Sequence, residues 1–236
     1  MKFLKKLLLL IILIILVICA IIILNGYKLY INTLNKTNLS DKIAEIKSKE
    51  TYVSINNVPD YYINAIIAVE DHRYREHGPV DYIALARAMI SNIKSKEFNE
   101  GGSTITQQVA KNLYFISETD VVSRKVAEVF VSIDLEKQYS KDDILEFYIN
   151  TIYFGDGYYG IREASKGYYK KEPIDLTLNE ATMLAGVPNA PSVYAPTVNP
   201  DLAKQRQKKV IRSMVEYKYL SQEEADKLIS EIDAQW

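Results

Sequence analysis

The stretch EGGSTITQQVAKN, residues 100–112, combines a flexible entry with many uncharged hydrogen-bonding side chains and one cation. Gly101 and Gly102 let the backbone approach a ligand closely. Thr104 and Gln107 have the spacing of a capping box, so we expect a helix to begin here and to present free N–H groups to an anion. Lys111 follows about two turns along that helix. This pattern favours a site for sugar or diphosphate oxygens; the alternative is a flexible loop followed by a polar helix face.

The N-terminus predicts a membrane anchor. MKFLKK precedes an uncharged apolar run over residues 7–24, and about 20 such residues in a helix cross the hydrocarbon core of a bilayer. Lys2, Lys5 and Lys6 predict a cytoplasmic N-terminus. A cleaved secretory signal is one alternative, but no small-x-small cleavage site follows the run. A lipid on Cys19 is another, disfavoured because the apolar run continues past it.

The sequence divides the chain into three segments. Residues 1–24 are the cytoplasmic tip and transmembrane anchor, residues 25–57 are a polar juxtamembrane stalk rich in Asn and Lys, and residues 58–236 are an extracytoplasmic domain. The domain is long enough to bury a core of its own.

Composition excludes several classes of function. The 29 basic and 30 acidic side chains nearly cancel, which gives no electrostatic reason to expect nucleic acid as a partner. The single cysteine excludes an internal disulfide framework, and the two histidines exclude a His-rich metal cluster.

The fold class is predicted to be mainly α. Apolar residues recur at helical spacing in most segments after residue 58, and no multi-strand pattern appears. Helix starts are predicted at three further Ser/Thr-x-x-Asp/Glu pairs, namely Ser140 with Asp143, Thr177 with Glu180, and Ser221 with Glu224. Pro200 is expected to open another helix, whereas residues 189–200, with three prolines, are expected to form an extended loop.

Two carboxylates are candidates for acid–base chemistry. In AVEDHRYREHGPVD, residues 68–81, Glu70 ends an apolar helix, and partial desolvation there would raise its pKa toward general-base use. In SRKVAE, Arg124 and Glu128 share a helix face at a spacing of four residues, which suits a phosphate contact beside a second carboxylate. The alternatives are a solvated charged turn and a surface ion pair. Eight aromatic residues within 144–171 suit sugar stacking, an interfacial belt or core packing.

In order and spacing, these stretches resemble the motifs of the peptidoglycan glycosyltransferase domain. The matches are EDHRYREH with the first motif, GGSTITQQVAKN with the second, RKVAE with the third and ILEFYIN with the fourth. EASKGYYKK and the later LTLNEATMLAGVPNAPSVYAPTVNP resemble the closing segment, so the likeness covers roughly residues 55–215. Two positions depart from the family pattern: Pro79 stands where Gly is usual, and Asp120 stands where many members have Arg.

The resemblance implies a lysozyme-like helical domain against the outer face of the bacterial cell membrane, anchored by a single span. It implies polymerisation of lipid II into β-1,4-linked glycan strands, with inversion at the anomeric carbon and release of undecaprenyl pyrophosphate. Glu70 and Glu128 match the family's two catalytic glutamates and are expected to face each other across a cleft. The substrate-binding residues it implies are Asp71, His77, Ser103, Thr104, Gln107, Gln108, Lys111, Asn112, Arg124 and Lys125.

The resemblance also implies cofactors and partners. It allows a divalent metal, Mg²⁺ or Mn²⁺, at Glu128 and implies no organic cofactor. The partners it implies for this protein are lipid II, the growing glycan strand and the cytoplasmic membrane, and it allows membership of a cell-wall synthesis complex. Moenomycin is the expected inhibitor. Tyr114, Phe115 and Ile116 are expected to dip into the membrane interface.

Three rival interpretations stay open from the sequence. A membrane-bound glycan hydrolase would need Glu70 but not the accompanying cations. A non-enzymatic scaffold would need none of the polar motif residues. A bifunctional penicillin-binding protein would need a transpeptidase domain. SNIK, residues 91–94, spells S-x-x-K but lies within a predicted helix. Only about 20 residues follow the region of resemblance, so a monofunctional enzyme is expected.

Overall fold

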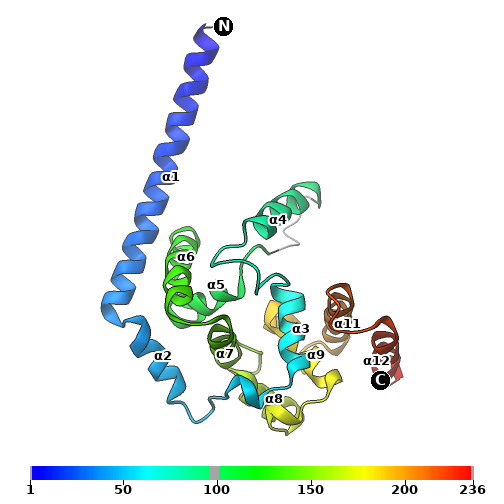
Figure 1. Ribbon diagram of the computed structural model, residues 1–236. Coiled ribbons are helices and arrows are strands. Elements are labelled where there is room, and N and C mark those ends of the chain that lie inside the picture. Colours follow the sequence, from blue (N-terminus) through cyan, green and yellow to red (C-terminus); the bar gives the residue numbers. More distant parts are fainter. Residues whose placement is uncertain (1, 96–100, 235–236) are drawn as a thin grey trace.

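The computed structural model describes residues 2–95 and 101–234, and this part of the chain is mainly helical (Figure 1). The helices in chain order are α1 Lys2–Lys36, α2 Leu39–Lys47, η1 Ile55–Asn57, α3 Asp60–Glu70, α4 Tyr82–Ser95, α5 Ile105–Ala110, η2 Lys111–Phe115, α6 Val121–Gln138, α7 Lys141–Thr151, α8 Ile161–Tyr169, η3 Pro173–Asp175, α9 Leu178–Gly186, η4 Val187–Asn189, α10 Pro191–Tyr194, α11 Pro200–Glu216 and α12 Gln222–Ala234. Within the described residues, β pairing is limited to one isolated bridge, Tyr153 with Tyr159. The mainly α prediction is confirmed.

The predicted helix starts are confirmed by their hydrogen bonds. Thr104 accepts from the backbone N–H of Gln107 at the start of α5. The pairs that open α7 and α9 form reciprocal capping boxes, and Ser221 with Glu224 does the same before α12. The prediction of an extended loop over residues 189–200 is wrong in part, because Pro191 occupies the first turn of the short helix α10, where its fixed φ suits a helix start.

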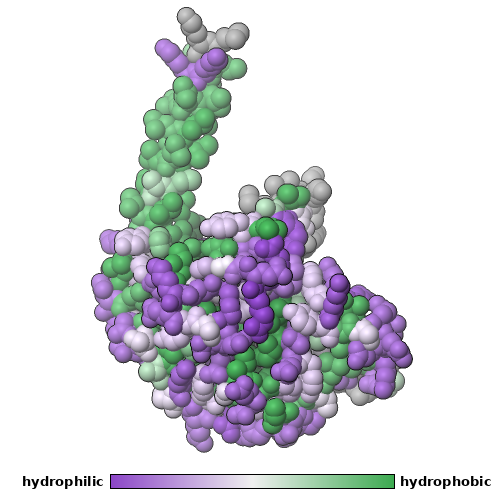
Figure 2. All heavy atoms as spheres, in the orientation of Figure 1, coloured by the Kyte–Doolittle hydropathy of each residue, from purple (hydrophilic) through white to green (hydrophobic). Residues whose placement is uncertain are grey.

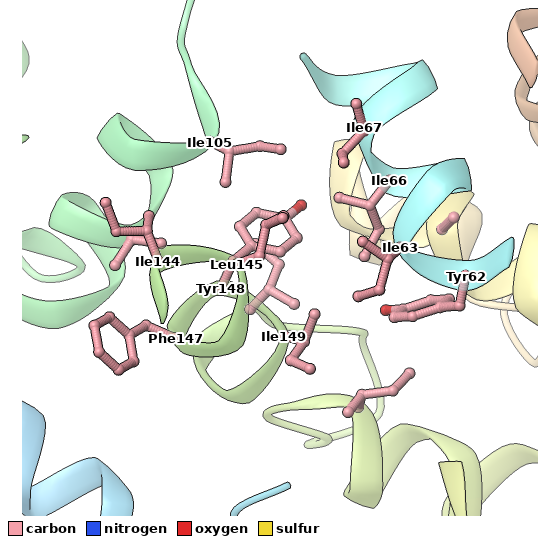
Figure 3. Close-up of a cluster of buried hydrophobic side chains, with 14 of the residues drawn as sticks. Tyr62, Ile63, Ile66, Ile67, Ile105, Ile144, Leu145, Phe147, Tyr148 and Ile149 are labelled. Carbon is pink, nitrogen blue, oxygen red and sulfur yellow. The ribbon is translucent and has the colours of Figure 1, made fainter. Parts of the chain in front are cut away.

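The core is built around the apolar residues of α7. Ile144, Leu145, Phe147, Tyr148 and Ile149 are each fully buried. Figure 3 shows Leu145, Tyr148 and Ile149 on the side of α7 that faces the apolar residues of α3, whereas Phe147 points away from α3. Most of the aromatic run is therefore core, although Tyr159 remains half exposed. As a result, the helices that carry the candidate site, α3, α5 and α6, all pack into the same hydrophobic core.

α1 projects away from the rest of the molecule (Figure 1). Its apolar side chains from Phe3 to Leu24 are exposed, as the continuous hydrophobic surface in Figure 2 shows. By length and composition this helix can cross a membrane. Residues 25–57, which the sequence sets apart as a stalk, form the end of α1, then α2 and η1. Leu39 and Ile43 of α2 are buried in the main core, so this segment packs onto the domain.

Candidate active site

Glu70 lies at the C-terminal end of α3 with a side chain that is only 10% exposed. Gln108 Nε2 donates to its Oε2 at 3.0 Å, and the guanidinium of Arg206 lies 3.4 Å from its Oε1. Burial raises the pKa of Glu70, while the Gln108 hydrogen bond and the charges of Arg206 and Lys209 oppose that rise. A carboxylate that takes up a proton more readily than usual suits general-base chemistry.

Asp71 ties this end of α3 to the start of α5. One carboxylate oxygen contacts His77 Nε2 at 2.7 Å, and the other accepts from the backbone N–H of Ile105 at 3.0 Å. Burial alone would lower the pKa of His77, but hydrogen bonds to Asp71 and to the Gly78 carbonyl raise it overall. Asp71 and His77 thus hold the first two motifs at a fixed distance from each other.

The second motif forms a capped, mostly buried helix start. Gln107 lines the cleft, and its buried Oε1 has no hydrogen-bond partner in the described structure. Lys111 is exposed and begins η2, a π-helical turn. Such turns occur often at functional sites. The motif therefore contributes a neutral amide side chain and a cation to the lining of the same cleft.

α6 supplies a carboxylate held between two cations. Lys125 Nζ lies 3.0 Å from Glu128 Oε2 and donates to Ser103 Oγ at 2.7 Å. Arg124 Nε lies 3.3 Å from Glu128 Oε1, and its other nitrogen donates to the Glu118 carbonyl. Glu128 is 3% exposed. The predicted pairing of Arg124 with Glu128 is confirmed, and the carboxylate is buried while Arg124 is partly exposed and Lys125 is exposed.

These groups meet in one cleft with a volume of about 680 Å³. Of the predicted site residues, the cleft is lined by Glu70, Asp71, Ser103, Gln107, Gln108, Lys111, Arg124, Lys125 and Glu128. Both glutamates thus line a single space, although they lie 58 positions apart in the chain.

Three predicted site residues lie outside the cleft lining. Thr104 caps α5 and donates to the Pro79 carbonyl at 3.0 Å, and His77 pairs with Asp71. The Nδ2 of Asn112 is buried without a hydrogen-bond partner in the described structure. The substrate contacts predicted for these three remain predictions, and in the free protein two of them serve the local framework.

The two departures from the family pattern have local roles. Asp120 is the N-cap of α6 and accepts from the N–H groups of Val122 and Ser123. Its exposed carboxylate cannot supply the phosphate contact that an arginine there would make. The carbonyl of Pro79 accepts from the side chains of Thr104 and Gln107.

Sequence reasoning missed two basic residues of α11 that line the cleft. Arg206 and Lys209 both line the cleft, with the Arg206 side chain buried and donating also to the Gly186 carbonyl. His72 stacks on Tyr217 at a ring distance of 4.2 Å, beside Arg87, and all three line the same cleft. The available signal was the spacing of Arg206 and Lys209 on one face of a helix, but their nearness to Glu70 depends on the fold.

Glu128 is a poor ligand for a divalent ion in this setting. Both of its oxygens already face cations, and the described side chains that contact it are Arg124 and Lys125. Hard divalent cations favour several oxygen ligands. The donor set here does not fit such an ion.

A separate group has metal-ligand spacing. Asp71, His77 and Asp81 offer atoms within 4.8 Å of one another. However, Asp71 is occupied by His77 and Ile105, and one oxygen of Asp81 accepts from two backbone N–H groups at the start of α4. This cluster therefore serves as a structural junction.

The predicted interfacial segment is corrected in part. Phe115 is 1% exposed and belongs to the core, and the hydroxyl of half-buried Tyr114 donates to the Thr37 carbonyl. Neither is free to enter a membrane, because both are packed within the domain. Ile116, at 59% exposure, remains available.

Comparison with known proteins gives consistent results. A family model described as Transglycosylase matches residues 37–215. Penicillin-binding protein 1A of Neisseria lactamica is 44% identical over 185 residues, which is 78% of this chain and 23% of that protein. Penicillin-binding protein 1F of Bacillus subtilis is 44% identical over 186 residues, which is 78% of this chain and 26% of that protein. The chain spans about a quarter of the length of these relatives.

Among solved structures, Penicillin-Binding Protein 1A from Haemophilus influenzae matches 75% of this chain and 17% of its own. The TM-score is 0.45 and the sequence identity is 23%.

Proposed function

The chain belongs to the transglycosylase family, and on that premise we propose that it polymerises lipid II into β-1,4-linked glycan strands of peptidoglycan. The observation that carries the proposal is the shared cleft, in which a buried glutamate with a raised pKa lies with a second glutamate and its two flanking cations. Base, leaving-group stabiliser and polar lining are thus all within reach of one substrate.

Glu70 is the general base in this proposal. A sugar hydroxyl attacks poorly unless its proton is removed as the new bond forms, and a positioned carboxylate contributes about 10²–10⁴-fold to such a step. The 4-hydroxyl of lipid II donates its proton to Glu70 while its oxygen attacks the anomeric carbon of the donor strand. Gln108 and Arg206 hold the carboxylate in place by the contacts described above.

The cations serve the leaving group. As the anomeric carbon–oxygen bond breaks, negative charge develops on the departing polyprenyl diphosphate, and preorganised cations stabilise that charge. Lys111, Arg124 and Lys125 line the cleft for this purpose. Glu128 orients two of them, because each of its oxygens contacts one. Attack from the face opposite the leaving group inverts the configuration to β.

A membrane location fits the substrate, whose polyprenyl tail stays in the bilayer. α1 is the anchor, and its N-terminal lysines favour a cytoplasmic N-terminus with the domain outside. α4 lies on the side from which α1 projects (Figure 1), and Tyr82, Ile83 and Ile90 on it are exposed. Exposed apolar groups on that side favour contact with the lipid surface.

Purified full-length protein incubated separately with lipid II and with finished glycan strands tests the proposal. We expect polymer from lipid II, inhibition of its formation by moenomycin, and no cleavage of finished strands. Glu70→Gln and Glu128→Gln should each lose polymerisation, whereas Glu223→Gln on the exposed face of α12 should retain it. Cleavage of finished strands without polymer would favour a hydrolase, and full activity of Glu70→Gln would contradict the assignment of the base.

A further inference from the structure

The membrane helix packs directly against the helix that carries Glu128. Gly26 of α1 is buried, although most of its neighbours along the helix are exposed. A Cβ at this position would overlap the side chain of Val126 and lie 2.9 Å from the carbonyl oxygen of Ser123. Glycine in a helix interior weakens the helix, but it lets two helices approach closely. Close approach of α1 to α6 therefore depends on this residue.

Aromatic side chains extend the contact along both helices. Phe130 of α6 lies against Tyr27 and Tyr30, with ring centroids 5.2 and 5.4 Å apart. The Tyr30 hydroxyl donates to Asp134 one turn further on. Because Gly26 pairs with residues 123–126 and Tyr30 with Asp134, the two helices run parallel in a fixed register.

The opposite side of α6 belongs to the cleft. Arg124, Lys125 and Glu128 line it, whereas Val126 and Phe130 face α1. The two faces of α6 are joined by a rigid backbone, so a shift of α6 along α1 would move the cations by the same amount.

The register also fixes the height of the cations relative to the bilayer. The exposed apolar run of α1 ends at Leu24, and Gly26 lies about 3 Å further along the helix axis. At this end of α6, Val121 and Val122 are also more than half exposed. The headgroup layer extends roughly 5–7 Å beyond the hydrocarbon on each side. Arg124 and Lys125 directly follow Ser123. The backbone of these two residues therefore lies at the level of the lipid phosphates.

We propose that the contact between Gly26 and α6 is a depth-setting device, which holds the diphosphate-binding cations of α6 at the height of a membrane-embedded polyprenyl diphosphate. Gly26, Val126 and Phe130 are positioning residues in this device and touch no substrate. The proposal rests on the proposed function, because the diphosphate is that of lipid II.

Comparing two substrates tests the device. Gly26→Leu in the full-length protein is assayed on native lipid II in proteoliposomes and on a water-soluble short-chain lipid II analogue in detergent. We expect activity in proteoliposomes to fall by about tenfold or more, since misplacement by about 1 Å is costly, and activity on the soluble analogue to stay within about twofold of the wild type. Equal loss on both substrates would overturn the proposal, because the contact would then serve only the shape of α6.

Matched variants separate the contact from general damage to α1. Asn25→Leu places the same side chain at an exposed neighbouring position and should leave both activities unchanged. Gly26→Ala should show the same split between substrates to a smaller degree, and it decides the question if Gly26→Leu does not fold. Gly26→Ala combined with Val126→Gly should regain part of the bilayer activity, because the overlap with the Val126 side chain is relieved while the close contact with the Ser123 carbonyl oxygen remains. No gain over Gly26→Ala alone would count against the proposal.

Depth can be measured without activity. A fluorophore on Val122→Cys, in a Cys19→Ala background, is quenched by lipids brominated at known depths. The quenching profile should shift in Gly26→Leu and not in Asn25→Leu; an unchanged profile would overturn the proposal. A wild type that polymerises neither substrate would instead refute the proposed function, and this inference with it.

Discussion

At the scale of single residues, the chemistry depends on how Glu70 is held. The carboxylate is buried, which raises its pKa, and Arg206 reaches it from a helix 136 positions later in the chain. The motif pattern predicted the glutamate, because the end of an apolar helix is visible in the sequence. It could not predict the arginine, since nothing local relates α11 to α3.

Replacing Arg206 should move the pH profile. Its charge lowers the pKa of Glu70, so Arg206→Gln should raise that pKa further. Because the base works only when ionised, the acidic limb of kcat/KM should move to higher pH. Arg212→Gln, an exposed arginine on the same helix, is the matched control. A superimposable profile for Arg206→Gln would show that the guanidinium does not tune the base.

Removing the carboxyl should change how stability depends on pH. A carboxyl with a raised pKa in the folded state binds its proton more tightly when folded, so its contribution to stability is present at low pH and lost as pH rises through the folded pKa. Glu70→Gln lacks this loss. The free energy of unfolding of Glu70→Gln minus that of the wild type should therefore increase with pH. Denaturant unfolding at several pH values measures it, and a difference that decreases with pH would contradict the raised pKa.

At the scale of helices, caps position the site. Thr104 is buried, accepts from the N–H of Gln107 and donates to the Pro79 carbonyl, so it fixes both the start of α5 and the loop after the first motif. Thr104→Ala should lower the free energy of unfolding by about 1 kcal/mol. Thr104→Ser, which keeps the hydroxyl, should lose much less. Equal losses in the two variants would mean that the methyl group, rather than the cap, stabilises this region.

The same scale shows what sequence patterns can predict. Cap pairs were reliable because they act over three residues, and the helical class followed from apolar spacing. The short helix α10 was missed because three prolines in one segment suggest a loop, although one of them sits at a helix start. The packing of residues 25–57 was missed because their polar composition hides isolated core residues such as Leu39 and Ile46.

At the scale of the whole molecule, α6 lies between a cleft with two glutamates and a helix that is long and apolar enough to cross a membrane. The first three motifs predicted most of the residues that gather in the cleft, because these motifs lie on or beside α3, α5 and α6, which pack into one core. The motifs did not predict that α1 packs against α6. The apolar run alone does not reveal what its far end contacts.

The most direct test measures polymer formation and polyprenyl diphosphate release together, from one lipid II reaction. The wild type should release one diphosphate for each sugar linkage formed, and Glu70→Gln should lose both products in parallel by about 10²-fold or more. Wild-type rates for both products in Glu70→Gln, or diphosphate release without any polymer in the wild type, would contradict the account.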